Sequence, residues 1–382
     1  MKILQLGKFY PIRGGVEKVM WDLTRGLSAR GVDCDMLCAM LRSDGFDESE
    51  QPLVEPGEEK TVRAVIRFNE HGRCICVPAL CKLAATMISP AMILWLRRHA
   101  CEYDIIHVHH PDPMACLALW MSGYRGRVVL HWHSDILKQK GLLTLYKPLQ
   151  RWLIRRADLV RGTTPAYVSQ SPDLQCCQDK VGYLPIGIED NMRKAVQNPE
   201  DGKVTVYSLG RLVEYKGYRY LIEAARYLPE RYRIVIAGKG PLRDELQAQI
   251  DALPDPGRVQ LLGYVSDAQA RELYNGCDLF VLSSVMKTEA FGIVQIEAMS
   301  CGRPVVATNI PGSGTSWVNE HGVSGLNVPI CDPRALADAI MGICEDRERY
   351  RQYCRDARAR YESLFTYDRM IDGALAIYGE LV

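Results

Sequence analysis

The chain has 382 residues, of which 47% are hydrophobic and 24% are charged, and its formal net charge is +1. This length exceeds what one hydrophobic core normally serves and suits two α/β domains, while the composition excludes a disordered or fibrous protein. The 14 cysteines are scattered and follow no secretory leader, so we expect reduced thiols and a cytoplasmic location.

The N-terminal half alternates short apolar runs with amphipathic runs, the pattern of a parallel sheet wrapped by helices. Its longest apolar stretch, from about Ala79 to Leu96, is interrupted by Lys82 and Pro90, and we expect a buried helix there rather than a membrane span. The other predicted elements are a strand at 2–7, a helix at 14–31, a strand at 33–39, an exposed loop at 42–60, and buried strands at 105–110 and 127–133.

Basic residues are concentrated in this half. Residues 60–161 carry 16 Lys and Arg against 6 Asp and Glu, and residues 138–161 interleave seven basic residues with Leu, Tyr, Trp and Ile. This segment fits a helix lying on an anionic membrane surface, and it fits equally a solvated helix whose apolar side is core. Nucleic-acid binding is set aside, because no aromatic platform or recognition motif accompanies the charge.

The C-terminal half repeats the alternation more regularly, which predicts a second Rossmann-like domain. The predicted strands lie at 203–212, 233–238, 259–264, 279–284, 303–308 and 325–329. The predicted helices begin near 217 and lie at 242–250, 267–276 and 289–302, followed by two terminal helical stretches.

Two carboxylates, Glu289 and Glu297, stand with seven residues between them across the start of a predicted helix. That start is predicted to run through Ala290, Phe291, Gly292 and Ile293. Free backbone N–H groups at a helix start favour the binding of a phosphate. A carboxylate such as Glu297 accepts paired hydrogen bonds from the two hydroxyls of a ribose, and Glu289 in the preceding turn can reach a sugar. The alternative is that Glu289 is a carboxylate favoured at the helix start by the helix dipole and that Glu297 is a surface residue. Apolar residues flank Glu297, however, which argues against a surface position.

Two cations support the same interpretation. Arg211 follows a strand and Lys216 opens the next helix, which predicts both at the carboxyl end of the sheet, where doubly wound sheets bind ligands. A departing nucleoside diphosphate gains negative charge, which fixed Arg and Lys donors stabilise in the transition state. Either residue alone is ordinary surface charge, but together with Glu289 they predict a catalytic donor site.

Glycines mark two more candidate binding loops. Gly14 and Gly15 stand between the first strand and its helix, where they let the backbone approach a ligand closely. In GKGPLR, Arg243 occupies the third glycine position of a dinucleotide fingerprint, so NAD binding is discounted and a turn beside the nucleotide is predicted. Gly14 and Gly15 are predicted to bind the donor, and the predicted donor site also includes Gly263, Tyr264 and Val265.

Histidines end two predicted strands of the first half, where an apolar strand would simply stop. His133 is predicted to be catalytic, and Gly15, His109 and Asp135 are predicted to bind an acceptor. For His107 we prefer a hydrogen-bonded strand-end residue without a catalytic role.

Close cysteine pairs do not predict a metal site. Cys74 with Cys76, and Cys176 with Cys177, lack the two-plus-two spacing of a structural zinc site. No metal and no other cofactor are therefore expected.

With these motifs in place, the chain resembles the retaining glycosyltransferases of family 4, which have the GT-B fold: two facing Rossmann-like domains with a cleft between them. The segment from Glu289 to Glu297 matches the family's Glu-x7-Glu motif, and Arg211 with Lys216 matches its donor-diphosphate pair. The Gly14 and Gly15 pair and His133 match the family's glycine loop and its sugar-contacting histidine. The resemblance extends through nearly the whole chain.

The resemblance implies an acceptor-binding domain at 1–187, a donor-binding domain at 188–365, and a last helix at 366–382 that crosses back onto the first domain. It implies a reaction that keeps the anomeric configuration, uses no metal, and lets the donor phosphate assist the acceptor hydroxyl. Glu289 would then orient the sugar and stabilise positive charge.

Ser316 and Trp317 stand where many relatives have a Glu, and this form is similar to bacterial rhamnosyl- and mannosyltransferases of surface-polysaccharide assembly. This form favours transfer of a hexose from GDP-mannose, with a UDP-hexose or UDP-N-acetylhexosamine as the alternative donor. The basic segment 138–161 and the usual work of the family favour a glycan or lipid-linked acceptor at the inner membrane face. Two other classes are a GT-B epimerase, against which the Glu-x7-Glu motif argues, and a non-catalytic sugar-nucleotide-binding subunit, against which the retained charged residues argue.

Overall fold

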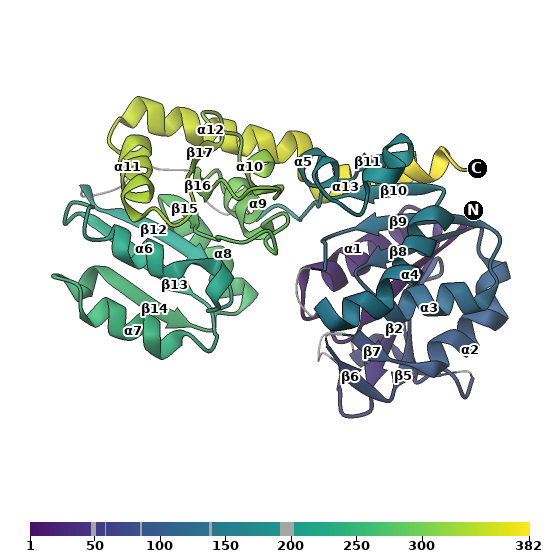
Figure 1. Cartoon of the computed structure of the whole chain (residues 1–382). Helices are drawn as coiled ribbons and strands as arrows, with labels where there is room; N and C mark the ends of the chain where they lie inside the picture. Colours follow the sequence, from purple (N-terminus) through teal and green to yellow (C-terminus); the bar gives the residue numbers. More distant parts are fainter. Residues whose placement is uncertain (47–50, 58, 85, 137–139, 192–201) are drawn as a thin grey trace. The chain divides into compact units, whose positions relative to one another are not determined.

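The structure, a computed structural model, describes residues 1–46, 51–57, 59–84, 86–136, 140–191 and 202–382 (Figure 1). The described chain forms two compact units: unit 1 comprises Met1–Ile186 and Asp368–Val382, and unit 2 comprises Gly187–Tyr367. Among the described residues, no helix combines the length and the apolarity that a membrane crossing needs.

Unit 1 is built on a sheet whose described strands follow the order β11-β10-β9-β8-β1-β2-β5-β4-β3. Its strands are β1 (Lys2–Phe9), β2 (Asp33–Leu41), β3 (Val54–Pro56), β4 (Ala64–Asn69), β5 (Gly72–Ala79), β8 (Ile105–His110), β9 (Arg127–Trp132), β10 (Leu159–Gly162) and β11 (Val181–Tyr183). The strands from β11 to β5 pair in parallel, whereas β4 pairs antiparallel with both β3 and β5. Nearly every side chain of β1, β2 and β8 is buried, as expected for strands covered on both faces.

Helices cover this sheet, and the last one comes from the end of the chain. They are α1 (Gly15–Ala29), α2 (Pro90–His99), α3 (Pro113–Ser122), α4 (Lys140–Arg156), α5 (Pro165–Ser169) and α13 (Tyr367–Gly379). Figure 1 shows α13 in yellow, and its residues from Asp368 on belong to unit 1. The fully buried Tyr378 ties α13 to β1, because its hydroxyl accepts a hydrogen bond of 2.9 Å from the Gln5 amide.

The prediction of one buried helix from Ala79 to Leu96 is wrong. The first part of this stretch is a hairpin of β6 (Cys81–Leu83) and β7 (Thr86–Ile88), and only α2 is helical. The Ser89 side chain accepts a hydrogen bond from the Met92 N–H, and Pro90 occupies the first turn, so the helix begins at Pro90.

Unit 2 has a second, wholly parallel sheet whose described strands follow the order β14-β13-β12-β15-β16-β17. Its strands are β12 (Val204–Leu209), β13 (Tyr232–Ala237), β14 (Val259–Gly263), β15 (Leu279–Leu282), β16 (Val305–Thr308) and β17 (Gly325–Val328). Its helices are α6 (Tyr218–Ala224), α7 (Arg243–Asp251), α8 (Asp267–Gly276), α9 (Ile293–Ser300), α10 (Thr315–Val318), α11 (Pro333–Cys344) and α12 (Arg347–Leu364).

Helix ends in the C-terminal half differ from the prediction in two places. Gly292 has φ +76° and precedes α9, so the helix starts at Ile293 and is shorter than predicted. The two predicted terminal helical stretches are three helices, because Asp346 caps a new helix, α12, by accepting hydrogen bonds from the N–H groups of Glu348 and Arg349.

The order of strands in unit 2 reverses between β12 and β15. From β12 the chain builds outward through β13 and β14, and from β15 it builds the other way through β16 and β17. The carboxyl ends of β12 and β15 therefore meet at a topological switch point, which is where open parallel sheets bind ligands.

Candidate active site

The predicted catalytic residues Lys216 and Glu289 meet at this switch point. Lys216 ends a 3-10 turn after β12, Glu289 lies in the loop after β15, and the Lys216 Nζ is 2.5 Å from the Glu289 Oε2. The two side chains are 10% and 12% exposed. The Ser284 hydroxyl donates a second hydrogen bond of 2.9 Å to the same carboxylate oxygen. A buried charge is stable only when it is paired and hydrogen-bonded, and this pair meets both conditions.

Backbone packing holds these two loops together. Gly217 has φ +63°, and a Cβ at this position would lie 2.2 Å from the Ser283 carbonyl oxygen, so only glycine fits. The Ser283 hydroxyl donates to the Lys216 carbonyl at 2.9 Å, and the Val285 N–H donates to the Tyr215 carbonyl at 2.8 Å. The position of Lys216 is thereby set by contacts with the loop that carries Glu289.

Arg211 has a different environment from Lys216. Its side chain is exposed, and one guanidinium nitrogen lies 3.4 Å from the Tyr215 hydroxyl. A partly solvated guanidinium presents several donors to an incoming anion, which suits a diphosphate.

Glu297 lies one turn into α9 and is partly buried. The Tyr274 hydroxyl, from α8, donates a hydrogen bond of 2.6 Å to its Oε2. Burial and the Glu297 carboxylate raise the pKa of Tyr274, which keeps this phenol a donor. The alternative of an ordinary surface residue therefore does not describe Glu297.

The segment Ala290 to Gly292 precedes the helix instead of opening it. The Phe291 side chain is 4% exposed and packs edge-on against Phe365, with ring centroids 5.9 Å apart. The Phe291 side chain is therefore not available to a ligand, whereas Ala290, before the first turn of α9 at Ile293, is half-buried.

The glycine-rich loop after β13 and the loop after β14 lie at the same edge of the sheet. A Cβ at Gly238 would lie 1.8 Å from the Gly210 carbonyl oxygen, so this loop packs directly against the loop that carries Arg211. Gly263 has φ +75°, and after it the Tyr264 ring is 68% exposed, with the Lys239 Nζ 4.8 Å from the ring centroid. Beside Tyr264 and Val265 is an open hollow of about 690 Å³.

In unit 1, His133 follows β9 and is held in a chain of hydrogen bonds. Its Nε2 is 2.9 Å from His109 Nδ1, and His109 Nε2 is 2.8 Å from the amide oxygen of Gln5. The Gln5 amide nitrogen reaches the Tyr378 hydroxyl at 2.9 Å, which lies 2.7 Å from His107 Nδ1. His109 is fully buried with both nitrogens engaged, so it contacts His133 and Gln5 and is closed to solvent.

Burial sets the protonation of these histidines. It holds the pKa values of His107, His109 and His133 well below the usual range, and it lowers the pKa of His131 to about 3. All four rings are therefore neutral near pH 7. His107, His109 and His133 act as hydrogen-bonding groups, whereas both ring nitrogens of His131 are buried without a hydrogen-bond partner among the described residues.

The nitrogens of His107, His109 and His131 lie within 4.8 Å of one another, which raises the question of a metal ion. The rings stack face to face, with centroids 4.6 Å (His107 and His109), 5.3 Å (His107 and His131) and 5.2 Å (His109 and His131) apart. An imidazole binds a metal through a lone pair in the ring plane, so stacked rings do not suit a shared ion.

The remaining candidates of unit 1, which are the donor candidate Gly14 and the acceptor candidates Gly15 and Asp135, have simpler surroundings. Gly14 caps the N-terminus of α1 in an extended conformation, and both Gly14 and Gly15 are exposed. The Asp135 Oδ1 accepts hydrogen bonds from the Trp132 indole at 2.9 Å and the Ser171 hydroxyl at 2.7 Å. Asp135 thus ties the loop after β9 to neighbouring elements, and acceptor binding by it stays a prediction.

Sequence analysis missed Ser284, Gln5 and Tyr378. Gln5 carried a signal, since it is a polar residue inside an otherwise apolar strand. Tyr378 carried none, because it is 373 positions away from Gln5 in the chain.

Two family models together, and each of two similar proteins, match most or all of the chain. The model of glycosyl transferases group 1 matches residues 189–360, and the model of glycosyltransferase family 4 matches residues 13–191. O-antigen chain mannosyltransferase C of Escherichia coli is 31% identical, over 100% of this chain and 99% of the relative. D-rhamnosyltransferase WbpZ of Pseudomonas aeruginosa is 31% identical, over 96% of this chain and 92% of the relative.

Among solved structures, HepE of Anabaena in complex with UDP aligns with a TM-score of 0.78 at 24% identity, over 100% of both chains. Sucrose-phosphate synthase of Thermosynechococcus elongatus aligns with a TM-score of 0.75 at 20% identity, over 100% of this chain and 99% of the other. These likenesses, with the two Rossmann-like sheets, confirm the predicted GT-B fold class. The chain therefore belongs to the GT-B glycosyltransferases, with group 1 and family 4 domains, and is an enzyme of that family.

Proposed function

We propose that this chain is a retaining, metal-independent glycosyltransferase that moves a hexose, mannose from GDP-mannose, to a glycan or lipid-linked acceptor in surface-polysaccharide synthesis. The observation that carries the proposal is the buried pair of Lys216 and Glu289 at the switch point of unit 2. The names of the two relatives, a mannosyltransferase and a rhamnosyltransferase, support the choice of hexose. Residues 1–187 are assigned to the acceptor and 188–365 to the donor.

The pair suits a leaving diphosphate. As the bond between the sugar and the phosphate breaks, negative charge grows on the leaving group, and a cation already fixed in place stabilises it most in the transition state. Lys216 is fixed by Glu289, and the exposed Arg211 supplies a second cation. Glu289, held by Ser284, is assigned to orient the sugar and to stabilise positive charge on it.

The other proposed donor contacts come from residues at the carboxyl edge of the unit 2 sheet. Glu297, held by Tyr274, is assigned to the ribose hydroxyls. The backbone at the start of α9 is assigned to the diphosphate. The exposed ring of Tyr264 with the adjacent Val265 is assigned to the nucleobase side of the donor.

In unit 1, His133 is assigned to the transferred sugar. Because burial lowers its pKa and keeps it neutral near pH 7, it acts as a hydrogen-bonding group without a formal charge. His109 is assigned to hold His133 in place, and Gly15 and Asp135 are assigned to the acceptor.

Thermal-shift binding of GDP-mannose, UDP-glucose, UDP-N-acetylglucosamine and the free diphosphates tests the donor site. A ligand at 100 times its Kd stabilises the folded chain by about 2.7 kcal/mol, which is readily measured. We expect a shift with GDP-mannose and GDP that Arg211→Ala and Glu297→Ala both reduce. Arg334→Ala, an exposed arginine on α11, and Glu348→Ala, an exposed glutamate on α12, are matched controls.

A shift confined to the UDP sugars would replace the proposed donor with the alternative one. The absence of any shift would favour a non-catalytic relative. Transfer measured with a chelator present tests metal independence, and the anomeric configuration of the product, read by proton NMR, tests retention.

The proposal includes contact of unit 1 with an anionic membrane surface through the segment 138–161, of which 138 and 139 lie outside the described residues. On α4, Arg151 and Arg155 are exposed, and Leu145 is 80% exposed. Leu145 borders an apolar hollow of about 280 Å³ that the β6–β7 hairpin and α3 also line. The opposite side of α4 is core, with Leu153 and Ile154 buried.

Flotation with anionic liposomes at low salt tests this contact. We expect the wild type to float and the variant Leu145→Ser with Arg151→Glu and Arg155→Glu to stay in the soluble fraction, while Arg334→Glu behaves as the wild type. A wild type that stays soluble refutes membrane contact and leaves the donor assignment untouched.

A further inference from the structure

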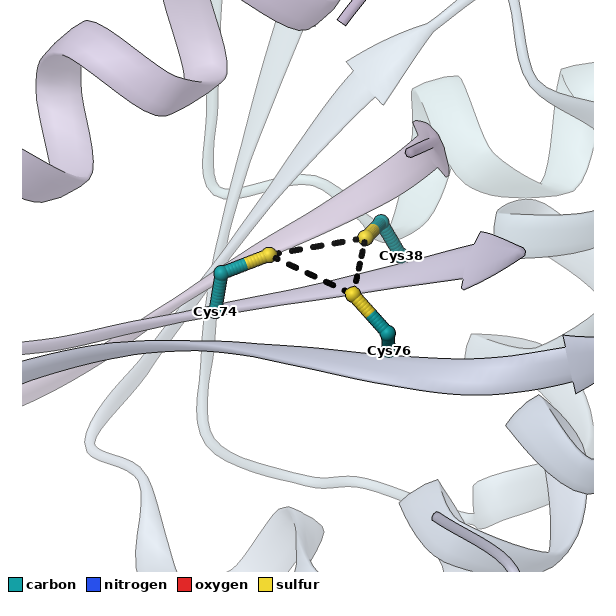
Figure 2. A group of neighbouring side chains, drawn as sticks. All are labelled: Cys38, Cys74 and Cys76. Carbon is teal, nitrogen blue, oxygen red and sulfur yellow. Dashed lines mark hydrogen bonds between the residues drawn. The ribbon is translucent and has the colours of Figure 1, made fainter. Parts of the chain in front are cut away.

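Three fully buried cysteines from two neighbouring strands meet at one point of unit 1. In the parallel pairing of β2 with β5, Cys38 lies directly opposite Cys76, and Cys74 lies two residues before Cys76 on the same face. Figure 2 shows the three sulfur atoms turned toward one another. The Sγ to Sγ distances are 3.6 Å (Cys38 and Cys74), 3.8 Å (Cys38 and Cys76) and 3.9 Å (Cys74 and Cys76).

These distances match those between thiolates that share one metal ion. An ion at the centre of this triangle would lie about 2.2 Å from each sulfur, against about 2.3 Å for a zinc–thiolate bond. All three side chains are 0% exposed, and each thiol has the other two as polar neighbours. Three cysteines that serve only as small core residues have no need to converge their sulfur atoms.

The surroundings select a soft ion. The cluster that contains the three cysteines also contains the thioethers of Met20, Met36 and Met40. Within the described residues, His, Cys, Asp and Glu contribute three ligand atoms to this group, which is short of the four that a structural zinc site uses. A three-sulfur site in a dry, sulfur-rich environment suits Cu(I), whose affinity for thiolate and thioether ligands is high.

Coordination is coupled to loss of the thiol protons, because a metal ion binds cysteine in its thiolate form.

We propose that Cys38, Cys74 and Cys76 form a site for one soft monovalent cation of the Cu(I) type, which joins β2 to β5 beneath α1. Each cysteine that coordinates releases its proton to solvent, and the ion keeps its oxidation state. The site lies in the core, so its role is structural, and it is independent of the proposed donor chemistry.

The test uses the full chain purified without oxygen from cells supplied with copper, and from cells supplied with zinc. The protein carries Cys81→Ser, Cys101→Ser, Cys176→Ser and Cys331→Ser, which removes the four exposed thiols. We expect one copper per chain that survives dialysis against a Cu(I) chelator, three sulfur neighbours by X-ray absorption, and a higher Tm than the metal-free chain.

Cys38→Ala and Cys74→Ala, each made in that background, are expected to abolish copper retention. Cys34→Ala is the matched control, because it removes another buried thiol of β2 and is expected to keep the copper. The metal-free Tm of each variant separates loss of the ion from loss of the fold. If both variants fail to fold, the proposal is decided by the copper stoichiometry and the sulfur coordination of the parent protein, which carries only the four exposed Cys→Ser changes.

The proposal is overturned if the parent retains no copper, if zinc is retained in place of copper, if copper has fewer than three sulfur neighbours, or if Cys34→Ala loses the ion as readily as Cys38→Ala. A disulfide between any two of the three cysteines, found by mass spectrometry of the purified chain, also overturns it.

Discussion

Removing the charge of Lys216 tests the central feature of the candidate site. The change Lys216→Met leaves the Glu289 carboxylate in a site that is 12% exposed, with the Ser284 hydroxyl as a remaining partner. Breaking a buried ion pair by removing one partner costs about 3–5 kcal/mol, and the residual exposure points to the lower end, about 3 kcal/mol. In a domain of this size, 1 kcal/mol changes Tm by about 2–4 °C, so we expect the Tm of unit 2 to fall by about 6–12 °C.

The matched experiments are a double-mutant cycle and a surface control, read by thermal denaturation of the full chain. Glu289→Gln alone is expected to lower Tm as well, whereas Lys216→Met with Glu289→Gln recovers most of the loss, because no uncompensated charge remains. Lys239→Met removes an exposed cation at the end of the neighbouring strand and is expected to change stability by less than about 1 kcal/mol. A Lys216→Met protein with the Tm of the Lys239→Met control would refute the buried pair.

Three further predictions concern both units. Gln5→Leu removes one of the two partners of the Tyr378 hydroxyl, which keeps His107, and leaves the His109 Nε2 without its partner. It is expected to cost about 1–3 kcal/mol by urea denaturation, and a neutral result would refute the hydrogen-bond chain. Because burial holds the pKa values of the strand-end histidines below those of the unfolded chain, the unfolded state binds more protons below about pH 6.5, and stability falls from pH 7 toward pH 5. Tm measured across this range is expected to fall less for His131→Leu than for the wild type, and an equal fall would contradict the assignment. Gly238→Ala is expected to destabilise the fold by more than about 1 kcal/mol, because Gly238 has φ +138° and the new Cβ would lie 1.8 Å from a carbonyl oxygen. Gly342→Ala, in open space on α11, is expected to stabilise the fold by about 0.5–1 kcal/mol. Equal effects of the two substitutions would refute the close packing of the loop at Gly238.

The sequence was sufficient to predict the alternation of strands and helices in unit 2. Each predicted strand from 203–212 to 325–329 coincides with one of β12 to β17. Buried parallel strands are short apolar runs, and this pattern is visible without tertiary information. The prediction was wrong for the stretch from Ala79 to Leu96, because an apolar run bends into a hairpin as readily as it forms a helix, and the cap at Ser89 decides where the helix begins.

The candidate donor site was predicted in part. The sequence alone marked Glu289, Glu297, Arg211 and Lys216 by their types and spacing. It did not reveal that Lys216 and Glu289 form a pair, since they are 73 positions apart and meet only because β12 and β15 are neighbours in the sheet.

The same reason explains what the sequence left hidden elsewhere. In the sequence, Cys74 and Cys76 lack the spacing of a metal site and Gln5 is an isolated polar residue. Only the pairing of β2 with β5 places Cys38 beside the two cysteines, and only the packing of α13 places Tyr378 beside Gln5. Local periodicity and turn chemistry depend on residues a few positions apart, so they can be predicted from the sequence. Contacts between distant segments depend on the order of strands in a sheet and on where the last helix packs, so only the tertiary structure decides them.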